Sequence, residues 1–146
     1  MKRVIFALVA ALAPGVAGAQ GAPAYAPAEN PFQGDYEIAL REPVVLRVDV
    51  LGVRLDDVTL TPLAEPTGER INCEVAIAGD SAAKKKAELT VVLLFEDAAG
   101  KGLERAALDV FKVKSGKKFR ETQEVPLAAA TLAGMKRVYV FVQVAF

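Results

Sequence analysis

The chain has 146 residues, with no histidine, one cysteine and equal numbers of basic and acidic residues, 18 of each. Without histidine, a serine or cysteine nucleophile lacks its usual imidazole base, and histidine-ligated zinc or copper sites are excluded. The balanced charge also gives no reason to expect a nucleic-acid partner, because that kind of binding depends on an excess of basic residues.

The first 19 residues have the pattern of a secretory signal peptide. Lys2 and Arg3 form a basic start, an apolar run covers residues 4–13, and Ala17-Gly18-Ala19 supplies small residues for cleavage. The run is shorter than the ~20 residues of a spanning helix, so we expect no transmembrane helix after cleavage. The mature chain would keep 127 of the 146 residues, with 16 basic and 18 acidic ones, and would be periplasmic or extracellular.

Residues 20–34, QGAPAYAPAENPFQG, are rich in alanine, proline and glycine and have no apolar period. This composition is typical of a flexible tether. Tyr25 and Phe32 leave open that the tether carries a short recognition segment. We therefore expect one folded domain at 35–146, which is long enough to bury a core of its own.

From residue 35 onward, apolar residues recur at every second position, as in half-buried strands. Examples are VVLRVDV at 44–50, INCEVAI at 71–77 and LTVVLLF at 89–95, with turn residues between the runs. Seven or eight such strands, the first at 36–41, predict an all-β fold, an antiparallel β-sandwich of immunoglobulin-like type. Only residues 127–135, LAAATLAGM, favour a short helical turn, after a strand that we expect to end at Pro126.

The last ten residues, RVYVFVQVAF, allow two interpretations, because alternate apolar residues also occur in small outer-membrane β-barrels. A barrel strand needs one apolar face and the barrel needs aromatic girdles, whereas KKFRETQEV at 117–125 is polar on both faces and the chain has no tryptophan. We therefore favour a central strand of a sandwich, covered on both faces, and keep the barrel as an alternative.

The stretch INCEVAIAGDSAAKKKAELTVVLLFEDAAGKGLER, at 71–105, resembles a pair of strands in bacterial secreted immunoglobulin-like or fibronectin-like sandwiches of the FxLYD type. Phe95, Asp97 and Gly100 stand where that type has an aromatic residue, an acidic residue and a glycine. A clear Leu-Tyr-Asp run is missing. The resemblance implies a fold and a location, and it implies no reaction.

Cys73 alternates with Ile71, Val75 and Ile77, so we expect it on the core face of its strand. A single cysteine cannot form an internal disulfide, and the fold must therefore depend on packing. An intermolecular disulfide or a reactive thiol stays open as the alternative in an oxidising compartment.

Catalytic groups are scarce. Ser81 and Ser115 lie near lysines, but a lysine that acts as a base must be desolvated, and these occupy predicted surface turns. The neighbouring acids at 56–57 and 96–97 point to opposite faces of extended chain, and the glycine-containing loop at 97–102 lacks the alternate acids of a calcium site. We expect no enzyme activity, no cofactor and no metal site.

Residues 111–120 are predicted to form a hairpin with a turn at Ser115-Gly116. One face of this hairpin would carry four basic residues: Lys112, Lys114, Lys118 and Arg120. Such a face could bind lipopolysaccharide, an acidic polysaccharide or an acidic protein, or it could protect an edge strand from pairing with other chains.

These features predict an exported, non-catalytic β-sandwich that serves the cell envelope as a binding or structural module, with a protein as its partner. The alternative is a protein that binds a polyanion or the envelope through the basic hairpin. An acidic envelope polymer would then be the partner.

The signal pattern predicts cleavage before Gln20. Mass spectrometry of protein from the envelope fraction or the medium should find Gln20 as the first residue. Protein in that fraction that still begins at Met1 would contradict the prediction.

Overall fold

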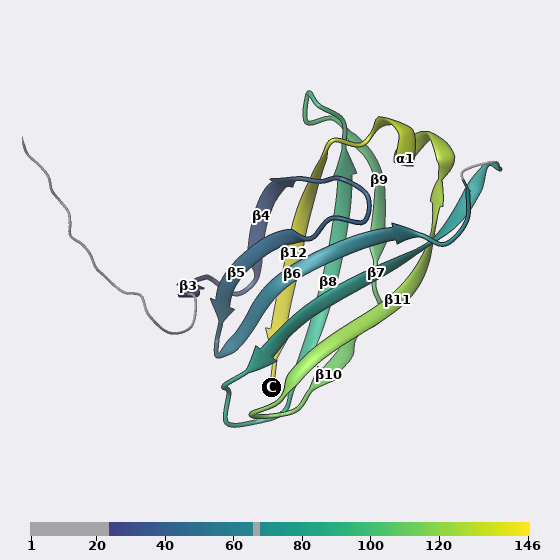
Figure 1. The fold of residues 1–146 in the computed structure, drawn as a ribbon. Coiled ribbons are helices and arrows are strands. Elements are labelled where there is room, and N and C mark those ends of the chain that lie inside the picture. Colours follow the sequence, from purple (N-terminus) through teal and green to yellow (C-terminus); the bar gives the residue numbers. More distant parts are fainter. Residues whose placement is uncertain (1–23, 66–67) are drawn as a thin grey trace, which may run out of the picture.

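Residues 24–65 and 68–146, which the computed structural model describes, form two β-sheets packed face to face (Figure 1). The β12 sheet has the order β10-β8-β12-β4, with β9 also paired to β8, and the β7 sheet has the order β11-β7-β6-β5-β3. The elements are β3 (Ala26–Pro27), β4 (Phe32–Glu37), β5 (Val44–Val50), β6 (Val53–Pro62), β7 (Arg70–Ser81), β8 (Ala87–Glu96), β9 (Gly102–Ala107), β10 (Phe111–Val113), β11 (Lys118–Ala128), α1 (Ala129–Gly134) and β12 (Arg137–Ala145).

The predicted all-β sandwich with one short helix is confirmed, and the sheets are not closed into a barrel. The predicted number of strands, seven or eight, is too low, because each sheet has five among the described residues. β9, GLERAA, was not predicted because its apolar residues do not alternate. The first long strand is Phe32–Glu37, earlier than the expected 36–41.

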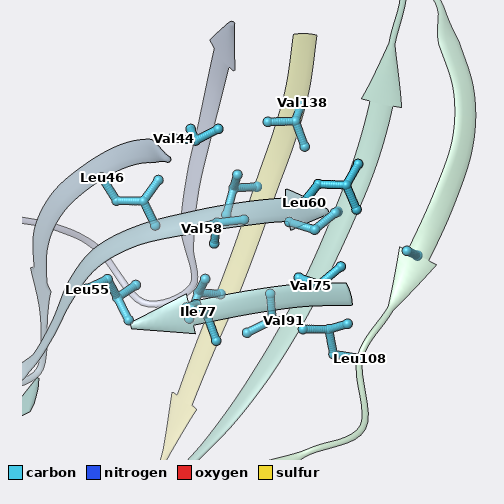
Figure 2. Packing of buried hydrophobic residues seen from close by; sticks show 14 of the residues in the cluster. Val44, Leu46, Leu55, Val58, Leu60, Val75, Ile77, Val91, Leu108 and Val138 are labelled. Atoms are coloured by element: carbon cyan, nitrogen blue, oxygen red, sulfur yellow. The ribbon is translucent and has the colours of Figure 1, made fainter. Parts of the chain in front are cut away.

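Alternate side chains of the long strands fill the space between the two sheets (Figure 2). β6 and β7 contribute Leu55, Val58, Leu60, Val75 and Ile77, and the facing β8 and β12 contribute Leu89, Val91, Leu93, Val138, Val140 and Val142; all are fully buried. Burying one such side chain stabilises the fold by about 1.5–3 kcal/mol relative to leaving it in water. This core is the main source of stability, because the single cysteine, Cys73, is a free thiol and no disulfide contributes.

β12 lies inside its sheet, between β8 and β4, as expected for a central strand. The expected cover on both of its faces is wrong. Its valines are buried, whereas Tyr139 and Phe141 on the other face are only partly buried. In the described part of the chain, no third layer of strands or helices lies on this outer face of the sheet.

The expected tether at 20–34 is wrong for its described part, because residues 24–34 are attached to the sandwich. β3 pairs with β5, and the ring of Tyr25 lies 5.8 and 5.4 Å from the guanidinium carbons of Arg47 and Arg54. The Tyr25 hydroxyl donates a hydrogen bond to Asp56. The predicted signal peptide lies outside the described residues.

The predicted hairpin at 111–120 is also wrong. β10 pairs with β8 and β11 pairs with β7, so the turn at Ser115-Gly116 crosses from one sheet to the other. The expected strand end at Pro126 is wrong as well, since β11 continues to Ala128. A proline is tolerated there because β11 is the edge of its sheet, where one row of backbone groups needs no partner.

Glu104 on β9 connects four elements at the end of the sandwich that carries α1. Its carboxylate accepts hydrogen bonds from the Ala128 N–H at 2.9 Å, the Thr131 hydroxyl at 2.7 Å and the Arg70 guanidinium at 2.8 Å. Burial by itself would raise the pKa of Glu104, but these bonds favour the charged form and lower its pKa overall. The carboxylate therefore stabilises the start of α1 against β7 and β9.

Replacing Glu104 with alanine should lower the free energy of unfolding at pH 7 by about 1–3 kcal/mol, because the Ala128 N–H and Thr131 lose their charged acceptor. The lowered pKa means that the wild-type advantage is present above the unfolded-state pKa and is lost as the pH falls through the folded-state pKa. Urea unfolding at pH 7 and near pH 3 measures both effects. Glu124→Ala, at an exposed site on β11, is the control, and an equal loss in both variants would contradict this role.

Cys73 is completely buried beside Ile71, Val75 and Ile77, as predicted, and burial raises the pKa of its thiol. A thiol reagent should therefore label it slowly in the native protein and rapidly in denaturant. Cys73→Ser should destabilise the fold by about 1–3 kcal/mol, since a hydroxyl would be buried without a reliable partner. Immediate full labelling of the folded protein would contradict this placement.

Candidate binding surfaces

Two lysine-rich loops meet at the end of the sandwich where the chain terminates (Figure 1). The Ser81 N–H donates to the Lys117 carbonyl at 3.0 Å, and the Gly116 N–H donates back to the Ser81 carbonyl at 2.9 Å. The Ser115 hydroxyl donates to the Ala83 carbonyl at 2.6 Å. These bonds hold residues 81–83 against 115–117 and so bring the lysines that flank them to one end.

We call this surface the lysine end; its members, all exposed, are Lys84, Lys85, Lys86, Lys114, Lys117 and Lys118. None of the ion pairs within residues 24–65 and 68–146 includes any of them. Asp80, which lies opposite Lys118 across β7 and β11, is paired with Arg54 at 2.6 Å. The positive charge of the lysine end is therefore not neutralised by these ion pairs.

The four predicted site residues are divided by the fold. Lys114 and Lys118 belong to the lysine end, but Lys112 lies opposite Glu88 in the β12 sheet, and Arg120 lies opposite Ala78 in the β7 sheet. They do not share one hairpin face, because β10 and β11 belong to different sheets. The lysines at 84–86 were visible in the sequence, but only the bonds between the two loops show that they join Lys114 and Lys117.

Two exposed apolar side chains lie beside these lysines. Leu51 occupies the tight turn between β5 and β6, where both it and Gly52 have positive φ, and Phe146 is the last residue. Together with Ala83, Lys84 and Lys85 they line a hollow of about 340 Å³. The lysine end therefore combines unpaired positive charge with a small apolar recess.

Three of the residues considered for catalysis or calcium binding, Ser81, Ser115 and Asp97, form hydrogen bonds that shape loops. The Ser81 hydroxyl accepts a hydrogen bond from the Ala83 N–H at 3.2 Å, and the Ser115 hydroxyl donates one to the Ala83 carbonyl. Asp97 accepts bonds from the Ala99 and Lys101 N–H groups, both at 2.9 Å, and thereby shapes the turn after β8. Within the described ranges there is no group of three or more Cys, Asp and Glu residues that could hold a metal ion.

An acidic pair that the sequence did not indicate flanks Arg137 of β12. Asp35 comes from β4 and pairs with Arg137 at 3.1 Å, and Glu96 comes from β8. Burial raises the pKa of Glu96, the nearby Asp35 carboxyl raises it further, and Arg137 opposes both. Residues distant in sequence form this pair, which explains why only the neighbouring acids were considered from the sequence.

The outer face of the β12 sheet carries the second candidate surface. Val92 and Leu94 of β8 lie beside Tyr139 and Phe141 of β12, and we call these four residues the aromatic face. Together with Arg105 of β9 they line a shallow hollow of about 280 Å³. Since a partly exposed apolar cluster on a sheet commonly marks an interaction site, this face is a candidate for protein contact.

The sequence matches no family in a scan of protein families, and no curated protein matches it. The resemblance to FxLYD-type sandwiches accordingly stays a prediction. Among the described residues, no helix is long and apolar enough to span a membrane.

Proposed function

We propose that the protein is exported and serves the cell envelope as a non-catalytic binding module that holds an acidic polymer at its lysine end. The observation that carries this proposal is the meeting of two loops that places six exposed lysines, none of them in the ion pairs described above, at one end of a rigid sandwich. A polymer with repeated negative charges fits such a surface better than a ligand with one charge, because its affinity grows with each charge that is neutralised.

The positions of the lysines support polymer binding over the alternative that the basic residues only protect the edge strand β11 from pairing with other chains. Lys118 and Arg120 lie on the edge strand β11, where basic side chains discourage pairing with other chains. Lys84, Lys85 and Lys86 lie in the loop between β7 and β8, outside any strand, so edge protection does not account for them. The export part of the proposal rests on the signal pattern of residues 1–19.

Charge reversal tests the lysine end. The triple variant Lys84→Glu, Lys85→Glu, Lys117→Glu should bind immobilised dextran sulfate at least about tenfold more weakly at about 50 mM salt, because several contacts to the sulfate groups are lost. Wild-type binding should itself fall steeply as salt rises. Circular dichroism should show an unchanged fold, since exposed charges contribute little to stability.

A matched control reverses three basic residues at the opposite end of the sandwich, Arg41, Lys101 and Lys136, which are all exposed. This control changes the net charge by the same amount and should keep most of the binding. If both triple variants lose binding equally, the effect is one of net charge, and the lysine end is not a binding site.

A further inference from the structure

The charged residues on either side of the aromatic face form a pattern that is complementary to itself. The register of the β12 sheet places four residues side by side in one row across the strands: Asp35 on β4, Tyr139 on β12, Leu94 on β8 and Arg105 on β9. The row therefore has an acid at one end, an aromatic and an aliphatic residue in the middle and a base at the other end, and the Tyr139 hydroxyl donates a hydrogen bond to Gln33 of the next row. The next row of outward-facing residues is Gln33, Phe141, Val92 and Ala107, and it carries no charge.

Both charged ends of the first row face water. Asp35 and Arg105 are exposed, and none of the ion pairs of the described chain includes Arg105. Asp35 is paired with Arg137, whose side chain is partly buried beside it in the sheet. Arg105 is thus a cation at the rim of an apolar hollow with no partner in an ion pair of its own chain, as far as the described residues go.

Consider a two-fold axis that runs parallel to the strands and lies above the aromatic face, over the line between β8 and β12. Rotation about this axis places the same row of a second copy over the first row in reverse order. Strands are about 4.8 Å apart, so Leu94 and Tyr139 lie about 2.4 Å on either side of the axis and Asp35 and Arg105 about 7 Å. In a second copy packed face to face, each Arg105 would lie over the Asp35 of the other copy, and each Tyr139 over Leu94. Sheets pack in this aligned manner at a distance of about 10 Å.

We propose that the aromatic face binds a second copy of this chain, in a symmetric dimer with two Arg105–Asp35 ion pairs around a centre of Tyr139, Phe141, Val92 and Leu94. The occupant is a second copy because the row is self-complementary, as an interface with two-fold symmetry requires. Four strand widths and the nine residues of β12 limit the footprint to on the order of 500 Å² per copy. An interface of this size is at the lower limit for stable complexes, so the dissociation constant should be on the order of micromolar to tens of micromolar.

Sedimentation velocity of the chain without its first 19 residues, from about 1 to 500 µM, tests the proposal. We expect a monomer that becomes a dimer in the micromolar range. Phe141→Glu should leave only monomer across this range, because it places a charge in the apolar centre. Val45→Glu, at an exposed valine on the other sheet, is the control and should dimerise as the wild type does.

A charge exchange identifies the geometry. Arg105→Glu places two acids together and Asp35→Lys places two bases together, so each variant alone should dimerise at least about tenfold more weakly. An equimolar mixture should recover dimers, because in the mixed dimer the two introduced charges are opposite and face each other, while the other contact keeps the wild-type pair of Arg105 and Asp35. Circular dichroism of each variant excludes a folding defect, and Phe141→Glu gives a second test if Asp35→Lys does not fold.

Three results would overturn the proposal. They are a wild-type chain that stays monomeric at the highest concentration, a Phe141→Glu variant that dimerises normally, and a mixture of charge variants that shows no recovery although both variants are folded. If the wild-type chain stays monomeric, the aromatic face becomes a candidate site for a different protein or for a saccharide. Polymer binding at the lysine end is measured with other variants, so its success or failure does not depend on these results.

Discussion

The structure depends on burying one face of each sheet against the other without a disulfide to assist. Because side chains alternate along a strand, the choice of the inner face decides which residues remain outside. Val138, Val140 and Val142 are inside, and therefore Tyr139 and Phe141 must be outside. The aromatic face follows directly from packing the valines of β12, and the same rule puts Lys118 and Arg120 on the outer side of β11.

The lysine end has a different origin, in the path of the chain between the sheets. The chain passes from β7 to β8 and from β10 to β11 at the same end of the sandwich, and both passages are crossovers from one sheet to the other. Crossover loops are exposed and need polar residues, and here lysine supplies most of them. The opposite end is organised around an acid, Glu104, whose carboxylate accepts hydrogen bonds from the Ala128 N–H and the Thr131 hydroxyl.

The sequence was sufficient for the features that depend on alternation. It located most of the long strands, the burial of Cys73 and the short helix after β11, because each of these is a local pattern. The predictions from the sequence were wrong where the structure of a segment depends on which distant strand or residue it contacts. KVKSGKK has the composition of a hairpin turn, but composition does not say whether the two strands pair with each other or with β8 and β7. The proline-rich start resembles a tether in the same way, yet Tyr25 finds two arginines and an aspartate from strands β5 and β6. Likewise, the lysines at 84–86 become part of a larger basic surface only because the Ser115 hydroxyl donates a hydrogen bond to the Ala83 carbonyl at 2.6 Å and so holds the two loops together. Contacts between residues distant in sequence create these surfaces, and the local alternation of apolar residues does not predict such contacts.

The direction of the strands relative to the two surfaces has a consequence for affinity. An axis parallel to the strands leaves the direction along them unchanged, so a dimer built on it presents both lysine ends on the same side. A polymer bound by one copy would then meet the second at a high effective concentration, and weak single contacts would combine into strong attachment. A chain that holds its ligand loosely as a monomer would thus become a bivalent clamp once its local concentration passes the dissociation constant of the dimer.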